Sequence, residues 1–89
     1  MEPAFIFERM MKHVIEDDFI NAKASIMSDI NKIDSNLLSS MIIMNADNHL
    51  DLIRAASGYS FMSEEIQKYY TKPELAIIDY KNKFNNKSQ

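Results

Sequence analysis

The side chains that could support metal binding or acid–base catalysis are few and poorly spaced. His13 and His49 are the only imidazoles, and they fall on different predicted helices. Asp47 and Asp51 stand two residues to either side of His49, and this spacing places side chains on opposite faces of a helix. The sequence therefore predicts neither a metal site nor a bound cofactor.

Motifs for nucleophilic catalysis and for phosphate binding are also missing. The chain has no cysteine and one glycine, which excludes thiolate chemistry, disulfides and a glycine-rich phosphate loop. Adjacent acids such as Asp17 and Asp18 point about 100° apart on a helix, so they are typical of helix starts and not of a catalytic pair. We therefore expect a protein that is not an enzyme.

The charge distribution narrows the choice of partners. The net charge is −3, although residues 81–89 contain three lysines and no acid, so the rest of the chain is strongly acidic. An acidic body disfavours binding to nucleic acid. The apolar runs fall short of the ~18 residues of a membrane span, and no secretion signal is visible. We expect a cytoplasmic protein that binds neither nucleic acid nor a membrane.

Apolar residues recur at intervals of three and four along most of the chain, which predicts an all-α fold. With 89 residues, one glycine and two prolines, the chain fits a single compact bundle of five to six short helices. We expect a domain over residues 1–80 and a flexible basic tail over 81–89. The expected helices span residues 3–16, 19–33, 35–44, 47–57 and 64–72, with a last helix from Pro73.

Polar residues mark the expected helix starts. Asp17 or Asp18 can cap the second helix, or both can lie on the solvent face of one continuous helix. Asp34, Asp47 and Ser63 are the expected caps of the next three helices. The expected core consists of apolar residues on the predicted inner faces: Phe19, Ile26, Ile30, Leu37, Met41, Leu50, Ile53, Phe61 and Ile66.

The stretch SGYSFMSEEI contains the one glycine. Gly58 stands at the end of a predicted helix, where we expect it to supply a positive φ. Tyr59 and Phe61 then form a short extended link, and Glu64 and Glu65 lie in the first turn of the next helix.

Together, DSNLLSSM, LDLI and SGYSFMSEEI resemble the Nif-eleven-like leader-peptide family, which is associated with nitrogen-fixation and nitrile-hydratase-like proteins. Members are leader regions of ribosomally made, post-translationally modified peptides. The resemblance covers residues 25–70. The matching residues are Asp34, Leu37, Met41, Leu50, Ile53, Gly58, Tyr59, Phe61, Ser63, Glu64, Glu65 and Ile66.

This resemblance implies a domain that is bound by a peptide-modifying enzyme, with any modification falling between Pro73 and Gln89. No Gly-Gly or Gly-Ala cleavage site follows Tyr70, so the chain can be either a precursor peptide or an accessory recognition module. The alternatives are an acidic inhibitor or regulator of a partner protein, and a homodimer. We expect the docking surface to consist of the helices over residues 35–44 and 47–57 and the Tyr59–Phe61 link. The expected partner-binding residues lie around the glycine stretch: Leu52, Tyr59, Phe61, Met62, Glu64 and Glu65.

Overall fold

The structure is a computed structural model that describes residues 2–87. It contains six α-helices and one 3₁₀-helix, with no strand in that range, so the all-α prediction is confirmed. The elements are α1 (Pro3–Ile15), α2 (Phe19–Ile33), α3 (Leu37–Met44), α4 (His49–Ser57), α5 (Glu64–Gln67), the 3₁₀-helix η1 (Lys68–Tyr70) and α6 (Glu74–Lys87).

The link between α1 and α2 is a tight turn that settles the alternative left open at the paired acids. Asp17 has φ 58°, in the left-handed region, which ends the first helix. Asp18 then caps α2, because its side chain accepts a hydrogen bond from the Asn21 backbone N–H at 3.1 Å. The carboxylate of Asp17 lies 2.9 Å from Nε2 of His49, at the start of α4.

Two of the expected caps are wrong by one or two residues. Asn36 caps α3 in place of Asp34, and Asn48 caps α4 in place of Asp47. Asparagine and aspartate cap equally well, so propensity alone does not choose between such neighbours. Ser63 caps α5 as predicted.

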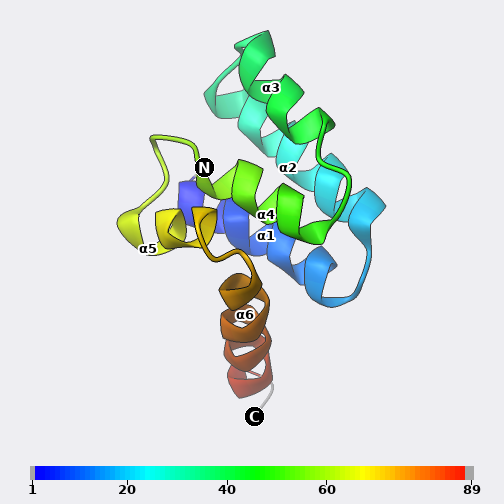
Figure 1. Cartoon of the computed structure of the whole chain (residues 1–89), viewed down its shortest axis with the longest axis vertical. Coiled ribbons are helices and arrows are strands. Elements are labelled where there is room, and N and C mark those ends of the chain that lie inside the picture. Colours follow the sequence, from blue (N-terminus) through cyan, green and yellow to red (C-terminus); the bar gives the residue numbers. More distant parts are fainter. Residues whose placement is uncertain (1, 88–89) are drawn as a thin grey trace.

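The α1–α2 pair is the centre of the molecule, and the other helices pack around it. The α1 and α2 helices pack most extensively, with α3 lying on α2 and α4 crossing α1 (Figure 1). The short α5 and η1 cover the end of α4, and α6 projects from the body at the opposite end from α3 (Figure 1). The molecule measures 40 × 25 × 24 Å.

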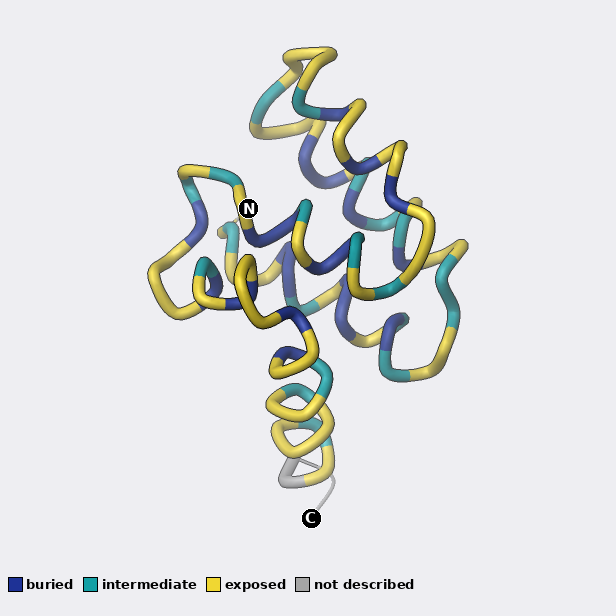
Figure 2. The backbone as a smooth tube through the Cα atoms, viewed as in Figure 1, coloured by how far each residue is buried: buried dark blue, intermediate teal, exposed yellow. Residues whose placement is uncertain are grey.

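The core lies between α1, α2 and α4, where buried segments converge (Figure 2). Ile26, Ile30, Ile53 and Ile66 are buried as predicted, and Phe19 and Phe61 pack against the core while partly exposed. Helix α1 contributes four fully buried side chains that are not among the expected core residues: Ile6, Phe7, Met10 and Met11.

Three expected core residues are instead on the surface. Leu37, Met41 and Leu50 are 71%, 43% and 40% exposed. Their spacing is helical, but periodicity identifies a face of a helix without saying which way that face points.

An aromatic cluster attaches α6 to the body. The Phe7 ring lies 5.7 Å from Tyr69 and 5.6 Å from Tyr80, and the Tyr69 hydroxyl donates to Asp79 at 2.7 Å. Burial, followed by this hydrogen bond to Asp79, raises the pKa of Tyr69 above its usual value. The helix continues through Lys87, so residues 81–87, where we expect a flexible tail, are helical in the structure. Residues 88–89 lie outside the described range.

The positive φ expected at Gly58 is wrong. Gly58 has φ −82°, and its N–H bonds to the Ala55 carbonyl, so α4 ends in an ordinary right-handed turn. The absence of a side chain matters for space, because a Cβ there would lie 3.1 Å from the Tyr70 ring. The following link is a turn and not an extended segment, although the Tyr59 and Phe61 rings do stack, 5.1 Å apart.

Candidate docking surface on α3

Helix α3 is unusual because it carries no charged side chain and turns most of its apolar residues outward. Its sequence is LLSSMIIM. Leu37 and Leu38 are 71% and 69% exposed, and Ile42 is 57% exposed. We call the exposed apolar side chains of this helix the α3 face: Leu37, Leu38, Met41, Ile42 and Met44.

The inward side of α3 is mostly polar. Ser40 is buried and donates from Oγ to Oδ1 of Asn31 on α2, at 2.7 Å. Ser39 donates from Oγ to Oδ2 of Asp34 at 2.8 Å. Ile43 is the one fully buried apolar residue of the helix. The usual arrangement of a surface helix, with apolar side chains in and polar side chains out, is therefore reversed.

Polar contacts also hold both ends of α3. At its start, Oδ1 of Asp34 accepts from the Asn36 N–H at 2.9 Å. This bond, together with that from Ser39, lowers the pKa of the Asp34 carboxyl. At its end, the Lys23 ammonium donates to the carbonyls of Met44 and Ala46, the latter at 2.9 Å. A cation at this position stabilises the negative end of the helix dipole.

Tyr59 ties α3 to the link after α4. Its hydroxyl donates to the Ser39 carbonyl, and burial raises the pKa of Tyr59 to about 12, with a further contribution from the charge of Asp34. Tyr59 and Phe61 are only partly exposed and pack against the core. They therefore support the placement of α3 more directly than they offer a surface to a partner.

Two further expected partner-binding residues lie in the core. Leu52 is fully buried in α4, and Met62 is 3% exposed, so neither side chain reaches the surface of the folded chain. Apolar type alone does not distinguish a core residue from an interface residue. Glu64 and Glu65 are exposed in the first turn of α5, where the helix dipole accounts for them.

The expected docking surface includes the helix over residues 35–44, but the sequence does not identify the exposed side of that helix. Leu37 and Met41 belong to the expected core, while Leu38, Ile42 and Met44 are not among the individually expected partner-binding residues. A signal was available in Ser39 and Ser40, which interrupt the apolar run with two side chains able to bond inward.

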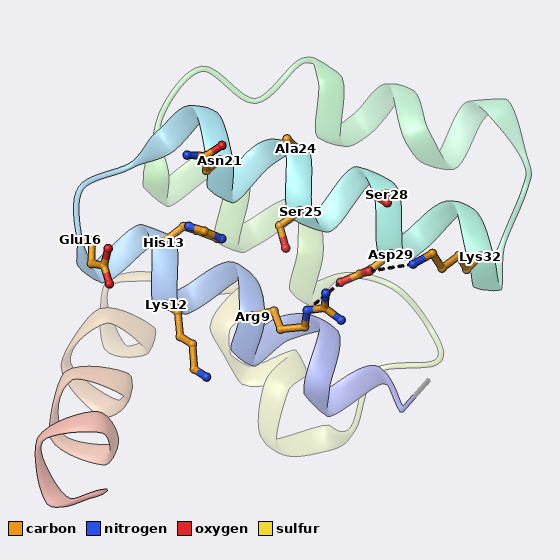
Figure 3. A pocket seen from close by; sticks show the side chains of 10 residues that line it. All are labelled: Arg9, Lys12, His13, Glu16, Asn21, Ala24, Ser25, Ser28, Asp29 and Lys32. Carbon is orange, nitrogen blue, oxygen red and sulfur yellow. Dashed lines mark ion pairs between the residues drawn. The ribbon is translucent and has the colours of Figure 1, made fainter. Parts of the chain in front are cut away.

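A second candidate is a polar groove of about 580 Å³ between α1 and α2 (Figure 3). Small side chains on α2, at Ala24, Ser25 and Ser28, leave this space open. Arg9 and His13 line it from α1, and the larger polar side chains of α2 line the other wall (Figure 3).

The charges in this groove largely compensate one another. The Asp29 side chain is 3% exposed, and its two oxygens lie 3.7 Å from Nε of Arg9 and from Nζ of Lys32. A buried carboxylate requires such cations nearby, so the network is accounted for by the packing of α1 on α2. The groove therefore gives weaker support for a function than the α3 face.

Two kinds of site have no candidate in the part of the chain that the structure describes. No group of three metal-ligating side chains comes together in residues 2–87. Within the same range, every helix is too short or too polar to cross a bilayer. Comparison of the chain with protein-family models, curated proteins and solved structures returned no significant match.

Proposed function

We propose that this chain is a protein-recognition domain that binds its partner through the α3 face. The observation that carries the proposal is the reversed orientation of α3, with serines bonded inward and large apolar side chains facing outward. The α3 face exposes an apolar area on the order of 500 Å², which equals the largest patch of a typical monomer, a patch that is often functional. The polar anchors around Ser39 and Ser40 hold the helix in this orientation before any partner arrives.

The chemistry of the surface describes the partner. The α3 face has no charge, so its complement is an apolar groove or helix face, because a charged partner surface would lose its hydration there without a compensating bond. The resemblance in residues 25–70 suggests a peptide-modifying enzyme as that partner. Under this proposal the enzyme docks on α3 and acts on residues between Pro73 and Gln89, which tethering keeps at high local concentration.

A second function, an inhibitor or regulator that covers a partner's surface, is favoured by α6. This helix continues through Lys87 and is attached to the core by Tyr80. An enzyme that requires an extended substrate would first have to unwind it.

Site-specific photocrosslinking tests the docking surface. A photoreactive amino acid at position 38 should capture the partner in cells that express the chain, whereas the same group at position 5 should not. Phe5 is the matched control because it is also an exposed apolar residue, 58% exposed, but lies on α1, outside both α3 and the segment from Pro73 to Gln89. Equal capture from both positions, or capture from position 5 alone, would contradict the proposal.

Purified components then separate the two functions. Leu38→Glu should weaken binding of the captured partner by about 100-fold, because it places a charge in an apolar interface, while Phe5→Glu, on α1, should leave binding unchanged. Intact-mass analysis after incubation with the partner and its cosubstrates should show an added mass if the chain is a substrate. Binding with no change of mass would establish the regulator.

A further inference from the structure

We infer that a second copy of this chain occupies the α3 face, so that the free protein is a two-fold homodimer. The inference rests on the proposed function, because it names an occupant for the same surface. It implies that self-association and binding of another protein through α3 exclude each other.

The shape of the α3 face suits a copy of itself. Leu37 and Met41 form one row with a spacing of four residues, and Leu38 and Ile42 form a parallel row beside it. Rows with this spacing are the ridges that interdigitate in the commonest class of helix packing, in which helices cross at about −50°. An α3 helix from a second copy offers the same ridges and the same intervening groove.

The size of the face is also sufficient. A helix of eight residues is about 12 Å long, so the contact zone of two crossed helices includes all of α3. The apolar side chains of the α3 face would contribute on the order of 1,000 Å² of buried surface from two copies, which reaches the lower range of specific interfaces. Contacts from neighbouring residues add to this area.

The charges around α3 permit the pairing. Lys32 and Asp34 lie near its start, while Lys23 and Asp47 lie near its end, so each end carries both signs. An antiparallel pair places the start of one helix beside the end of the other. Opposite charges can then face each other at both ends, and the central contact contains no charge.

Sedimentation velocity and light scattering on the full chain test the inference. The wild-type mass should rise from 10.3 kDa towards twice that value as the concentration increases from ~1 µM to ~1 mM, a range that spans typical weak-to-moderate dimers. Leu38→Glu and Ile42→Lys should each weaken self-association by about 100-fold, with Ile78→Glu as the control. Circular dichroism checks that each variant keeps its helical content.

Mixing the two variants tests the geometry. An antiparallel two-fold arrangement brings Leu38 of one copy beside Ile42 of the other. The Leu38→Glu and Ile42→Lys chains should therefore form a 1:1 heterodimer when mixed, although each is monomeric alone. Such complementation requires the two positions to meet across the interface, which a general loss of stability would not produce.

Two results would overturn the inference. One is a wild-type chain that stays monomeric up to ~1 mM, a concentration at which even weak specific dimers form. The other is a dimer that survives both α3 substitutions but is lost with Ile78→Glu. Neither result affects capture of a different protein from position 38, so the proposed function is tested separately.

Discussion

Helices α1 and α3 are both rich in large apolar residues, yet they use them in opposite ways. In α1, Phe7 and Met10 are fully buried, and charged residues occupy the outer side. In α3, the large apolar residues face outward apart from Ile43, and Ser40 is buried beside Ile43 against the body. A helix with a polar side has one way to pack. A helix without charged residues can be oriented by a few hydrogen bonds, and its remaining apolar side chains stay available for another molecule.

The largest expected effect is on stability, when one apolar side chain in the core and one on α3 are each truncated to alanine. Ile53→Ala, in the core, should lower the free energy of unfolding by ~2–5 kcal/mol because it leaves a cavity. Leu37→Ala, on α3, should change it by less than ~0.5 kcal/mol because that side chain is mostly exposed. Urea denaturation at low micromolar concentration, where self-association contributes little, measures both. Equal losses would show that the α3 face is packed in the folded monomer.

Removal of one hydroxyl tests how α3 is held. Tyr59→Phe deletes the hydrogen bond to the Ser39 carbonyl and should cost ~1 kcal/mol, with an accompanying increase in hydrogen exchange in α3. Exchange in α1 should stay as in the wild type. An equal increase in exchange in both helices would indicate that Tyr59 supports the whole fold and not α3 in particular.

Acid should weaken the starts of α2 and α3 together. Hydrogen bonds from Asn21 lower the pKa of Asp18, and those from Asn36 and Ser39 lower the pKa of Asp34. Because both pKa values are lower in the folded state, their stabilisation is present above the unfolded value of 3.8 and is lost as the pH falls through the folded values. The thermal midpoint should therefore decrease once the pH is lowered below about 4.

The double variant Asp18→Asn/Asp34→Asn isolates this contribution, since asparagine can still accept hydrogen bonds but does not titrate. Its thermal midpoint should depend less steeply on pH between 4 and 2 than that of the wild type. Glu64→Gln, which removes an exposed carboxylate from α5, serves as the control. A double variant with the wild-type slope would show that other carboxylates dominate the acid response.

The smallest effect is expected at Gly58. Its φ of −82° suits any residue, so Gly58→Ala introduces no backbone strain and requires only a small shift of the Tyr70 ring. Tyr70 is 54% exposed and has room to move. The thermal midpoint should change by no more than about 2 °C, which corresponds to a few tenths of a kcal/mol. A loss above 1 kcal/mol would indicate that contact with Tyr70 fixes the end of α4.

The helices could be predicted from the sequence because their signals are local. Asp18 and Ser63 mark helix starts through bonds made within one turn of the chain, and Pro3 marks one because its fixed φ and missing N–H suit the first helical position. The same locality explains the errors at Asp34 and Asp47, where a neighbouring asparagine competes for the same role. Periodicity also placed Ile26, Ile30 and Ile53 correctly, because each lies on a helix that has a distinct polar side.

The orientation of α3 could not be predicted because contacts distant in sequence determine it. The Lys23 ammonium donates to the Met44 carbonyl, 21 residues away, and the Tyr59 hydroxyl donates to the Ser39 carbonyl, 20 residues away. Nothing in LLSSMIIM specifies those partners. The same limitation applies to Leu52 and Met62, whose burial depends on how α4 crosses α1.

The turn at Asp17 has a consequence for the order of folding. The α1–α2 pair is built from local contacts and can form early, but its link holds a residue other than glycine in a left-handed conformation that costs ~1–2 kcal/mol. Two local hydrogen bonds help to offset this cost: the Asp17 N–H donates to the Val14 carbonyl at 3.0 Å, and the Asp18 N–H donates to the His13 carbonyl at 2.9 Å. The hairpin can therefore close before α4 docks, and the contact of Asp17 with His49, 32 residues later in the chain, is added to a turn that is already formed.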